Sequence, residues 1–369
     1  TLEGHTSSIM GVLLLPDGCI LSWSLWDYTL RVWDGHSGDT LVTFEGHTSR
    51  VKGALSLSNG RILSWSQEDK TLHLWDGRSG APLVILEGHT ESVSGALLLP
   101  EGRILSWAQD GTLRLWDGHS GAPLTTLEGH TESVSGALPL PDGRILSWAE
   151  DGTLRLWDGH SGTPLAILEG HTRPINGALQ LPDERFLSWS ADRTLRLWDG
   201  KSGAPIASLQ GHTGWVTGAL PLPDERILSW SGLPVWPNDR TLRLWDGQSG
   251  TPLAILEGHT QSVKGVLPLP GGRFLSWSGD RTLRLWDGHG SAPFATLEGH
   301  TKSVNSILPL PDGRFLSWSG DHTLRLWDGK SGAPLVTLKG HTRSVVGALP
   351  LPDGHFISWS EDGTLRLWD

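Results

Sequence analysis

The chain has 369 residues and a formal net charge of −11, and 37% of its residues are hydrophobic, a composition typical of a folded globular protein. The acidic balance argues against a nucleic-acid partner, because binding phosphates requires a basic face. A single cysteine, Cys19, excludes a disulfide framework and a cysteine-rich metal site. No run of about 18 apolar residues is present to cross a membrane, and without a leader-like segment we expect a cytoplasmic protein.

The sequence repeats itself with a period of about 41 residues. A Gly-His pair opens each repeat and a Trp-Asp pair follows about 28 residues later. The nine Gly-His histidines are His5, His47, His89, His130, His171, His212, His259, His300 and His341. The nine Trp-Asp tryptophans are Trp33, Trp75, Trp116, Trp157, Trp198, Trp245, Trp286, Trp327 and Trp368. A fixed period of this length indicates a solenoid, a propeller or another repeat array.

Short strands separated by turn residues are predicted within each repeat. In the eighth repeat, alternation of apolar and polar residues predicts strands over Val304–Leu310, Arg314–Ser319, Thr323–Asp328 and Pro334–Leu338. Pro-Asp-Gly and Gly-Asp-His segments supply the turns between the first three strands. Because no segment has helical spacing, we expect an all-β chain in which each repeat forms an antiparallel four-stranded meander.

Proline recurs inside the first predicted strand of several repeats. Because proline cannot donate to a strand ladder, it belongs on an edge strand. We therefore expect the first strand to be the innermost strand of its sheet, with one unpaired edge. The prolines are Pro139, Pro221, Pro268, Pro309 and Pro350.

The alternating Gly-His and Trp-Asp pairs over the whole chain resemble the WD-repeat β-propeller family, in particular its highly repetitive bacterial members. The resemblance implies one domain, residues 1–369, forming a single closed ring of nine four-stranded blades. It also implies that the N-terminal residues Thr1 to Glu3 complete the last blade and close the ring. A ring of seven or eight blades would leave unburied sheet faces. A monomer is expected, with a two-chain assembly as the alternative.

Each repeat carries a histidine, a serine, an aspartate and a tryptophan, which in the eighth repeat are His300, Ser317, Asp321 and Trp327. These residue types could form a nucleophilic triad. The resemblance instead implies a buried hydrogen-bond relay from Asp to His to Ser to the indole. Buried imidazole and indole N–H groups need such partners. Nine equal copies indicate a scaffold, so we predict no catalytic residue and no cofactor.

Seven further histidines lie outside the Gly-His pairs, and none has metal-ligand spacing to another. We expect them to be solvent-exposed and predict no metal site. They are His36, His73, His119, His160, His289, His322 and His355.

A second tryptophan follows the relay serine in all nine repeats, where family members often have glycine. Strand alternation turns it away from the serine, so we predict that it contacts the neighbouring blade, and we hypothesise that its bulk favours a wider ring.

The departures from the repeat are the candidates for function. The family resemblance implies that the Gly-His loop and the turn between strands two and three open on one face, called here the top face, where family members bind peptides and proteins. The three tryptophans that repetition leaves unexplained all map to this face. A six-residue insertion, 233–238, lies in the same turn of the sixth repeat. The predicted partner-binding residues are Trp215, Trp236, Leu233, Pro234, Val235, Trp26, Arg50 and Lys52.

The preferred function is a non-catalytic interaction scaffold or sensor module that binds a protein or peptide, with no nucleic-acid or membrane partner. One alternative is an engineered or purely structural repeat protein without a ligand. Another is an enzyme or small-molecule binder that uses the central channel. The insertion also has a local alternative, in which it folds onto its own blade and Trp236 covers Trp215.

Overall fold

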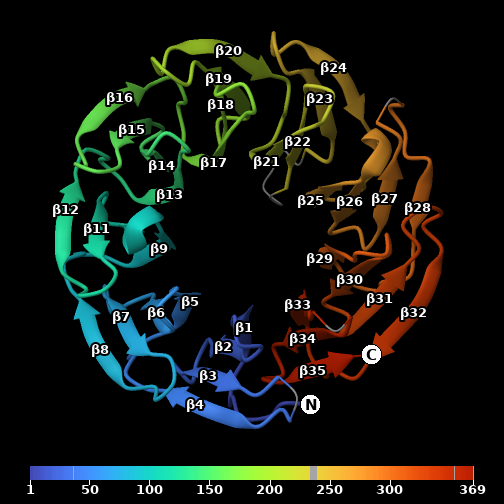
Figure 1. The fold of residues 1–369 in the computed structure, drawn as a ribbon. Coiled ribbons are helices and arrows are strands. Elements are labelled where there is room, and N and C mark those ends of the chain that lie inside the picture. The colour runs from blue at the N-terminus through green and yellow to red at the C-terminus, as the bar shows by residue number, and fades with distance from the viewer. Residues whose placement is uncertain (36, 233–238, 289, 353, 369) are drawn as a thin grey trace. The chain divides into compact units, whose positions relative to one another are not determined.

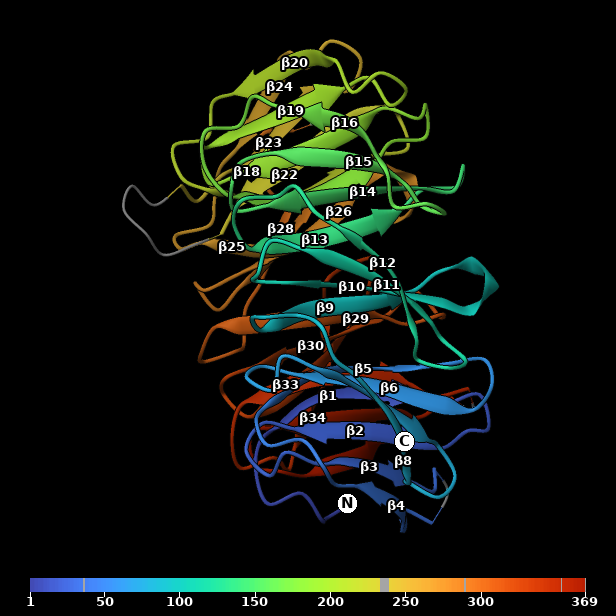
Figure 2. The same ribbon diagram turned by 90° about the vertical axis from the view of Figure 1, so that its left-hand side faces the viewer.

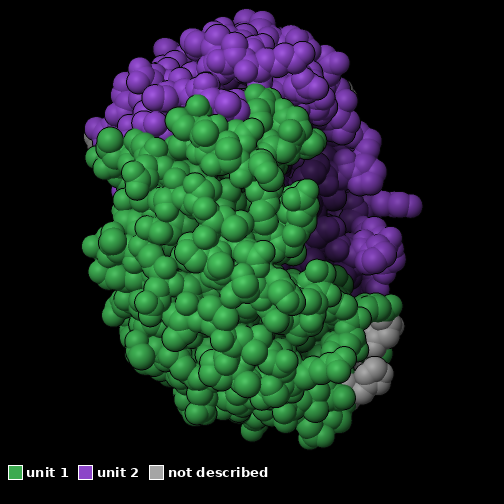
Figure 3. All heavy atoms as spheres, turned by 60° about the vertical axis from the view of Figure 1, so that its left-hand side comes forward, with its two compact units in different colours: residues 1–147, 157–164, 341–369 green, residues 148–156, 165–340 purple. Residues whose placement is uncertain are grey.

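The computed structural model describes residues 1–35, 37–232, 239–288, 290–352 and 354–368. The chain divides into two compact units (Figure 3). Unit 1 comprises residues 1–147, 157–164 and 341–369, and unit 2 comprises residues 148–156 and 165–340. Each unit is described by itself. The predicted single domain over 1–369 stays a prediction.

Within the described residues, thirty-five strands, β1 to β35, form nine antiparallel sheets, one for each sequence repeat and here called blades. Blades one to three contain β1 (Ile9–Leu14), β2 (Ile20–Ser24), β3 (Leu30–Trp33), β4 (Thr40–Phe44), β5 (Val51–Ser56), β6 (Arg61–Ser66), β7 (Leu72–Asp76), β8 (Pro82–Leu86), β9 (Val93–Leu98), β10 (Arg103–Ala108), β11 (Leu113–Asp117) and β12 (Pro123–Leu127). Blades four to six contain β13 (Val134–Pro139), β14 (Arg144–Ala149), β15 (Leu154–Asp158), β16 (Pro164–Leu168), β17 (Ile175–Gln180), β18 (Phe186–Ser190), β19 (Thr194–Trp198), β20 (Pro205–Gln210), β21 (Val216–Pro221), β22 (Arg226–Ser231), β23 (Leu242–Asp246) and β24 (Pro252–Leu256). Blades seven to nine contain β25 (Val263–Pro268), β26 (Phe274–Ser278), β27 (Leu283–Trp286), β28 (Ala295–Leu297), β29 (Val304–Pro309), β30 (Phe315–Ser319), β31 (Thr323–Trp327), β32 (Pro334–Lys339), β33 (Val345–Pro350), β34 (Phe356–Ser360) and β35 (Leu365–Trp368).

The nine-bladed all-β propeller predicted from the sequence is confirmed. Strands pair in sequence order within each blade, so β29-β30-β31-β32 form one meander. Their bounds lie within one residue of those predicted for the eighth repeat. Along unit 2, the first strands β17, β21, β25 and β29 lie on the inner side and β20, β24, β28 and β32 on the outer side (Figure 1). The prolines therefore end edge strands, as predicted.

Within the described residues, the only helical segments are two three-residue 3-10 turns, η1 (Pro100–Gly102) and η2 (Pro270–Gly272). No described helix is long and apolar enough to cross a membrane.

The hydrophobic core is divided among interfaces between successive blades, whose strands are seen from the side in Figure 2. Leu63 and Leu72 of blade two share a buried cluster with Val93, Ile104 and Trp116 of blade three. Corresponding clusters join blades one and two, and blades five and six. A single blade exposes both faces of its sheet, so each blade is stabilised by burial against the next.

The tryptophan after the relay serine lies across the first strand of its own blade and reaches the neighbouring blade. Trp65 is paired with Gly53 on the adjacent strand, and a Cβ on Gly53 would lie 2.3 Å from its ring. Only a residue without a side chain leaves the indole room to lie flat there. Trp65 also belongs to the buried cluster shared with blade three, which confirms the predicted interblade contact for this residue.

The two chain ends meet inside unit 1. Leu2 and Leu365 form an isolated antiparallel bridge, with N–H to O distances of 2.9 and 3.3 Å. Leu2 also shares a buried cluster with Ile9 and Trp33 of blade one and Ile357 of blade nine. The ninth blade nevertheless has three strands, because the expected fourth strand is reduced to this one bridge. Closure of a complete ring by the N-terminal strand stays a prediction.

Because the core lies between blades, we expect the loss of stability caused by a leucine substitution to depend strongly on where the leucine lies. Leu63→Ala removes a side chain that is fully buried between blades and is expected to lower the free energy of unfolding by about 2–5 kcal/mol. Leu83→Ala, on the outer strand β8 with 42% exposure, is the matched control and should change it little. Urea unfolding followed by tryptophan fluorescence measures both. Equal effects of the two substitutions would contradict a core located between blades.

Candidate functional site

A chain of buried hydrogen bonds connects four side chains in blade eight. The Trp327 Nε1–H donates to Ser317 Oγ at 2.8 Å. Because an indole can only donate, the serine hydroxyl in turn donates to His300 Nε2, also at 2.8 Å. His300 Nδ1–H is left to donate to Asp321 Oδ2 at 2.9 Å. The connectivity thus assigns the neutral Nδ1–H tautomer to this histidine.

The aspartate also orders both loops at the top of the blade. Asp321 Oδ2 accepts a hydrogen bond from the backbone N–H of Thr301, and Oδ1 accepts from the backbone N–H and hydroxyl of Thr323. Burial alone would raise the pKa of Asp321, but the hydrogen bonds from His300, Thr323 and Thr301 hold it below its usual range. The carboxylate therefore fastens the Gly-His loop to the turn between strands two and three.

Equivalent bonds recur along the chain. The Trp–Ser and Ser–His bonds occur in every blade. The serines are fully buried, Ser317 among them. A nucleophile must reach a substrate atom, so these serines are not placed for acyl transfer despite their triad-like partners.

Blade two differs from the others in what packs against its relay. Two residues before the Trp-Asp tryptophan, on the third strand, the other eight blades carry an arginine, and blade two carries His73. The arginines are Arg31, Arg114, Arg155, Arg196, Arg243, Arg284, Arg325 and Arg366. The expected exposed position of His73 is wrong: this residue is only 7% exposed, because its ring packs 4.2 Å from the ring of His47, centroid to centroid.

This packing gives blade two a cluster of possible metal ligands. One ligand atom from each of His47, Asp69 and His73 lies within 4.8 Å of the others. Burial lowers the pKa of His73 to about 4, and neighbouring His47 contributes to the decrease. Sequence spacing missed this cluster, since its members come from three different segments. The sequence does contain an indication of the cluster: when the nine repeats are aligned, blade two alone has a histidine where the others have an arginine.

The Gly-His loop and the turn between strands two and three lie side by side within a blade. The residue that begins the turn between strands two and three donates its backbone N–H to the third residue after the Gly-His histidine. Leu25 donates in this way to Ser8 at 2.9 Å, and Gln67 to Arg50 at 2.8 Å. In blades one and two the extra turn residue, Trp26 or Glu68, follows this bonded position and projects from the turn.

An aromatic side chain and a cation meet across blades one and two. The Arg50 guanidinium carbon lies 3.7 Å above the centroid of the Trp26 ring, a cation–π contact. Trp26 remains 52% exposed, and Lys52, two residues after Arg50 on β5, is also exposed. Met10 on β1 is 43% exposed. The sequence marked Trp26, Arg50 and Lys52 as candidates but did not predict that Trp26 and Arg50 touch.

The second predicted group, in blade six, is described only in part. Trp215 lies directly before β21 and is partly buried. Leu233, Pro234, Val235 and Trp236 lie outside the described residues. Their proposed contact with Trp215 stays a prediction.

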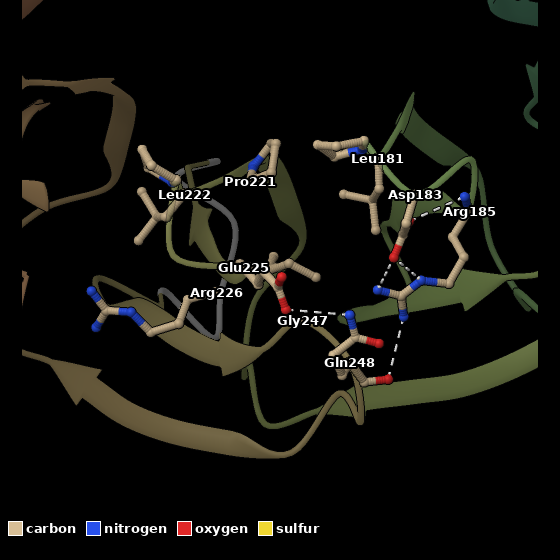
Figure 4. Close-up of a pocket in the computed structure, with 12 residues that line it drawn as sticks. Leu181, Asp183, Arg185, Pro221, Leu222, Glu225, Arg226, Gly247 and Gln248 are labelled. Atoms are coloured by element: carbon tan, nitrogen blue, oxygen red, sulfur yellow. Dashed lines mark hydrogen bonds and ion pairs between the residues drawn. The ribbon is translucent and has the colours of Figure 1, made fainter.

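A cavity of about 290 Å³ opens between the turns of blades five and six (Figure 4). Its lining includes Asp183, Arg185 and Gln248, and the Arg185 guanidinium pairs with Asp183 and donates to the Gln248 carbonyl at 3.3 Å. Corresponding turns line cavities between blades three and four and between blades seven and eight. These cavities recur with the repeat, and their charged groups are engaged in holding neighbouring blades together.

Comparisons with known proteins agree with this geometry. The family model described as "WD domain, G-beta repeat" matches residues 1–34, 38–76, 80–117, 121–158, 162–199, 203–246, 250–287, 291–328 and 332–369. The chain is similar to the crystal structure of the computationally designed Ika8 protein, with 26% identity and a TM-score of 0.67 over 89% of this chain and 98% of that one. It shares its fold with the WD40 β-propeller domain of Doa1, at 23% identity and a TM-score of 0.50 over 78% of this chain and 95% of that one. No curated protein matched.

Removal of a relay serine is expected to destabilise the fold. Ser317→Ala leaves the buried Trp327 indole N–H and His300 Nε2 without their shared partner, at a cost of about 1–3 kcal/mol. Ser58→Ala, at an exposed turn position, is the control and should be neutral. The measurement is the urea midpoint of each variant. A neutral Ser317→Ala would show that the relay does not stabilise its blade.

Acid should weaken the fold in two stages. Burial lowers the pKa of His212 and His259 below the ordinary value of about 6.5, so the unfolded chain binds more protons than the folded chain once the pH falls below that value. The relay aspartates, whose pKa values are also lowered, add a further loss below about pH 4. We therefore expect the melting temperature to decrease from pH 7 to pH 5 and to fall more steeply below pH 4. A melting temperature that is constant between pH 7 and pH 5 would contradict the neutral histidines.

Proposed function

Since the chain belongs to the WD-repeat family, a family of protein-interaction scaffolds, we propose that it is a non-catalytic binding module whose top face holds a peptide segment at blades one and two. The observation that carries this proposal is the contact between the exposed Trp26 and the half-buried Arg50. Trp26 and Arg50 differ from the residues at the corresponding positions of the other blades. They lie in the two loops whose backbone the relay aspartates hold by hydrogen bonds.

The chemistry of this pair favours a particular kind of ligand. Trp26 offers a large apolar surface on a tight turn, the type of residue that dominates interface energetics. Stacking on the indole fixes the Arg50 guanidinium while leaving its N–H edges able to bind a carboxylate. Lys52 adds a second positive charge nearby on the chain. We therefore propose a peptide with an acidic residue next to an apolar or aromatic one.

Blade six supports a second binding position, since Trp215 lies three residues after the Gly-His histidine His212 and the insertion 233–238 is unique to that blade. A ligand-free structural repeat protein is the main alternative function, and the similarity to the designed Ika8 protein favours it. The cavity of Figure 4 gives little support to an enzyme, because it recurs with the repeat and its charged groups bind one another.

Peptide selection tests the proposed site directly. A random peptide library displayed on phage is panned on the purified chain, and the enriched peptides are synthesised and titrated. We expect acidic-apolar motifs whose affinity decreases by about 30-fold in Trp26→Ala, equivalent to about 2 kcal/mol. Arg50→Gln should weaken the same peptides and reduce the salt dependence of binding, because it removes the proposed charge partner.

Two further variants separate the outcomes. Leu124→Ala removes a side chain of similar exposure, 51%, from the outer strand β12 and should bind like the parent. Trp215→Ala tests blade six. Loss of binding in Trp215→Ala with none in Trp26→Ala would overturn the site on blades one and two, and no enrichment of any motif would favour the ligand-free alternative.

A further inference from the structure

Next to the relay of blade two lies a second histidine, His73, which belongs neither to the relay nor to the proposed peptide site. In blades one, three, five, six, seven and eight an arginine guanidinium packs against the glycine of the Gly-His pair. In blade three, for example, Arg114 Nη1 lies 2.6 Å from the position that a Cβ on Gly88 would occupy. In blade six, Arg243 contributes to lowering the pKa of His212, so its positive charge reaches the relay. The arginine thus brings a fixed cation to the His–Asp pair.

Blade two lacks this cation. His73 stands at the arginine position, and an imidazole does not carry the permanent positive charge of a guanidinium. The nearest lysine along the chain, Lys70, is directed elsewhere, because its ammonium donates to the Thr90 carbonyl at 2.7 Å and lies 3.8 Å from Glu91. The Asp69 carboxylate therefore faces two imidazole rings without the guanidinium that its counterparts have.

The hydrogen bonds around Asp69 are rearranged as well. In blade eight the threonine after the turn, Thr323, donates its hydroxyl to the relay aspartate. In blade two the corresponding hydroxyl, on Thr71, bonds to His73 Nε2 at 3.2 Å. Asp69 Oδ1 accepts from the hydroxyl of Thr48 on the Gly-His loop. The substitution of arginine by histidine is accordingly accompanied by a local rearrangement that turns Thr71 toward His73.

We propose that His47, Asp69 and His73 form a site for a divalent transition-metal ion, with Zn²⁺ as the best-matched ion. Two imidazole nitrogens and one carboxylate oxygen are the donor set that Zn²⁺ prefers, at bond lengths of about 2.0–2.2 Å. The ligand atoms already lie within 4.8 Å of one another, so closing on an ion requires small side-chain movements. The ion supplies the positive charge that the arginine provides in the other blades.

Binding also follows a defined proton balance. The His47 Nδ1–H that donates to Asp69 occupies the nitrogen that would bind the metal. Metal binding requires the other neutral tautomer of His47, in which the proton has moved from Nδ1 to Nε2 and the Nδ1 lone pair binds the ion, so no net proton is released. His47 Nε2–H then donates to Ser64 Oγ, and this hydrogen bond fixes the ring as an outer-shell partner does in known zinc sites.

Zinc titration of the untagged, EDTA-treated full chain tests the proposal. We expect saturable binding of one Zn²⁺ per chain by calorimetry and a rise in melting temperature with Zn²⁺. Co²⁺ in place of Zn²⁺ should give the visible absorption bands of a low-coordinate site.

His73→Arg is the decisive variant, because it restores the residue found in the other eight blades and so preserves the fold. It is expected to abolish Zn²⁺ binding without lowering the melting temperature of the metal-free protein. His160→Gln, which removes an exposed histidine, is the matched control and should bind Zn²⁺ like the parent. Absence of saturable binding, retained binding in His73→Arg, or equal loss in His160→Gln would overturn the proposal.

Discussion

The structure depends on the need of a buried indole N–H for a hydrogen-bond acceptor. Eight of the nine Trp-Asp tryptophans, all except Trp368, are fully buried, so that their only polar group lies inside the core. The relay serine supplies the acceptor, its hydroxyl donates to the histidine Nε2, and the histidine Nδ1–H donates to the aspartate. A fully satisfied network of this kind specifies one packing arrangement, because each partly satisfied alternative leaves a buried group unpaired. The burial of the tryptophan thereby determines the conformation of two loops on the blade surface.

That coupling between core and surface explains how a uniform chain can carry a local function. The Gly-His loop and the turn after strand two are held by the same carboxylate. A side chain that is substituted or inserted in either loop therefore projects from an ordered backbone. Trp26, the extra turn residue of blade one, is such a change, and Arg50 on the next blade stacks on it. His73 is a change of another kind, in which a strand residue beside the relay is replaced. Both lie in the first two repeats, where the turn between strands two and three is one residue longer than in blade three.

Most of the fold could be predicted from the sequence because the information is local and repeated nine times. The bounds of β29 to β32 follow from alternation and turn residues, and the blade count follows from the Gly-His and Trp-Asp pairs. The sequence predicts a fourth strand for blade nine from the residues before Gly4, but these residues form only the single Leu2–Leu365 bridge.

The specific contacts of the candidate sites could not be predicted, because they depend on distances between segments far apart in the chain. Residues 26 and 50 belong to different blades, and no periodicity brings an arginine over an indole. The ring contact between His47 and His73 depends on the twist of one strand against the loop above it. In both cases the sequence shows that a position departs from the repeat, and only the structure shows what it touches.

The most direct test of the relay as the source of this order is hydrogen exchange at the tryptophan side chains. In a spectrum of the chain labelled with ¹⁵N at the indole nitrogen, each Trp-Asp tryptophan gives a separate N–H signal that can be followed in D₂O. We predict that the signals of Trp33, Trp116 and Trp327 persist for as long as the core backbone amides, whereas that of Trp26 disappears at once. Exchange of the Trp-Asp indoles as fast as that of Trp26 would contradict the account.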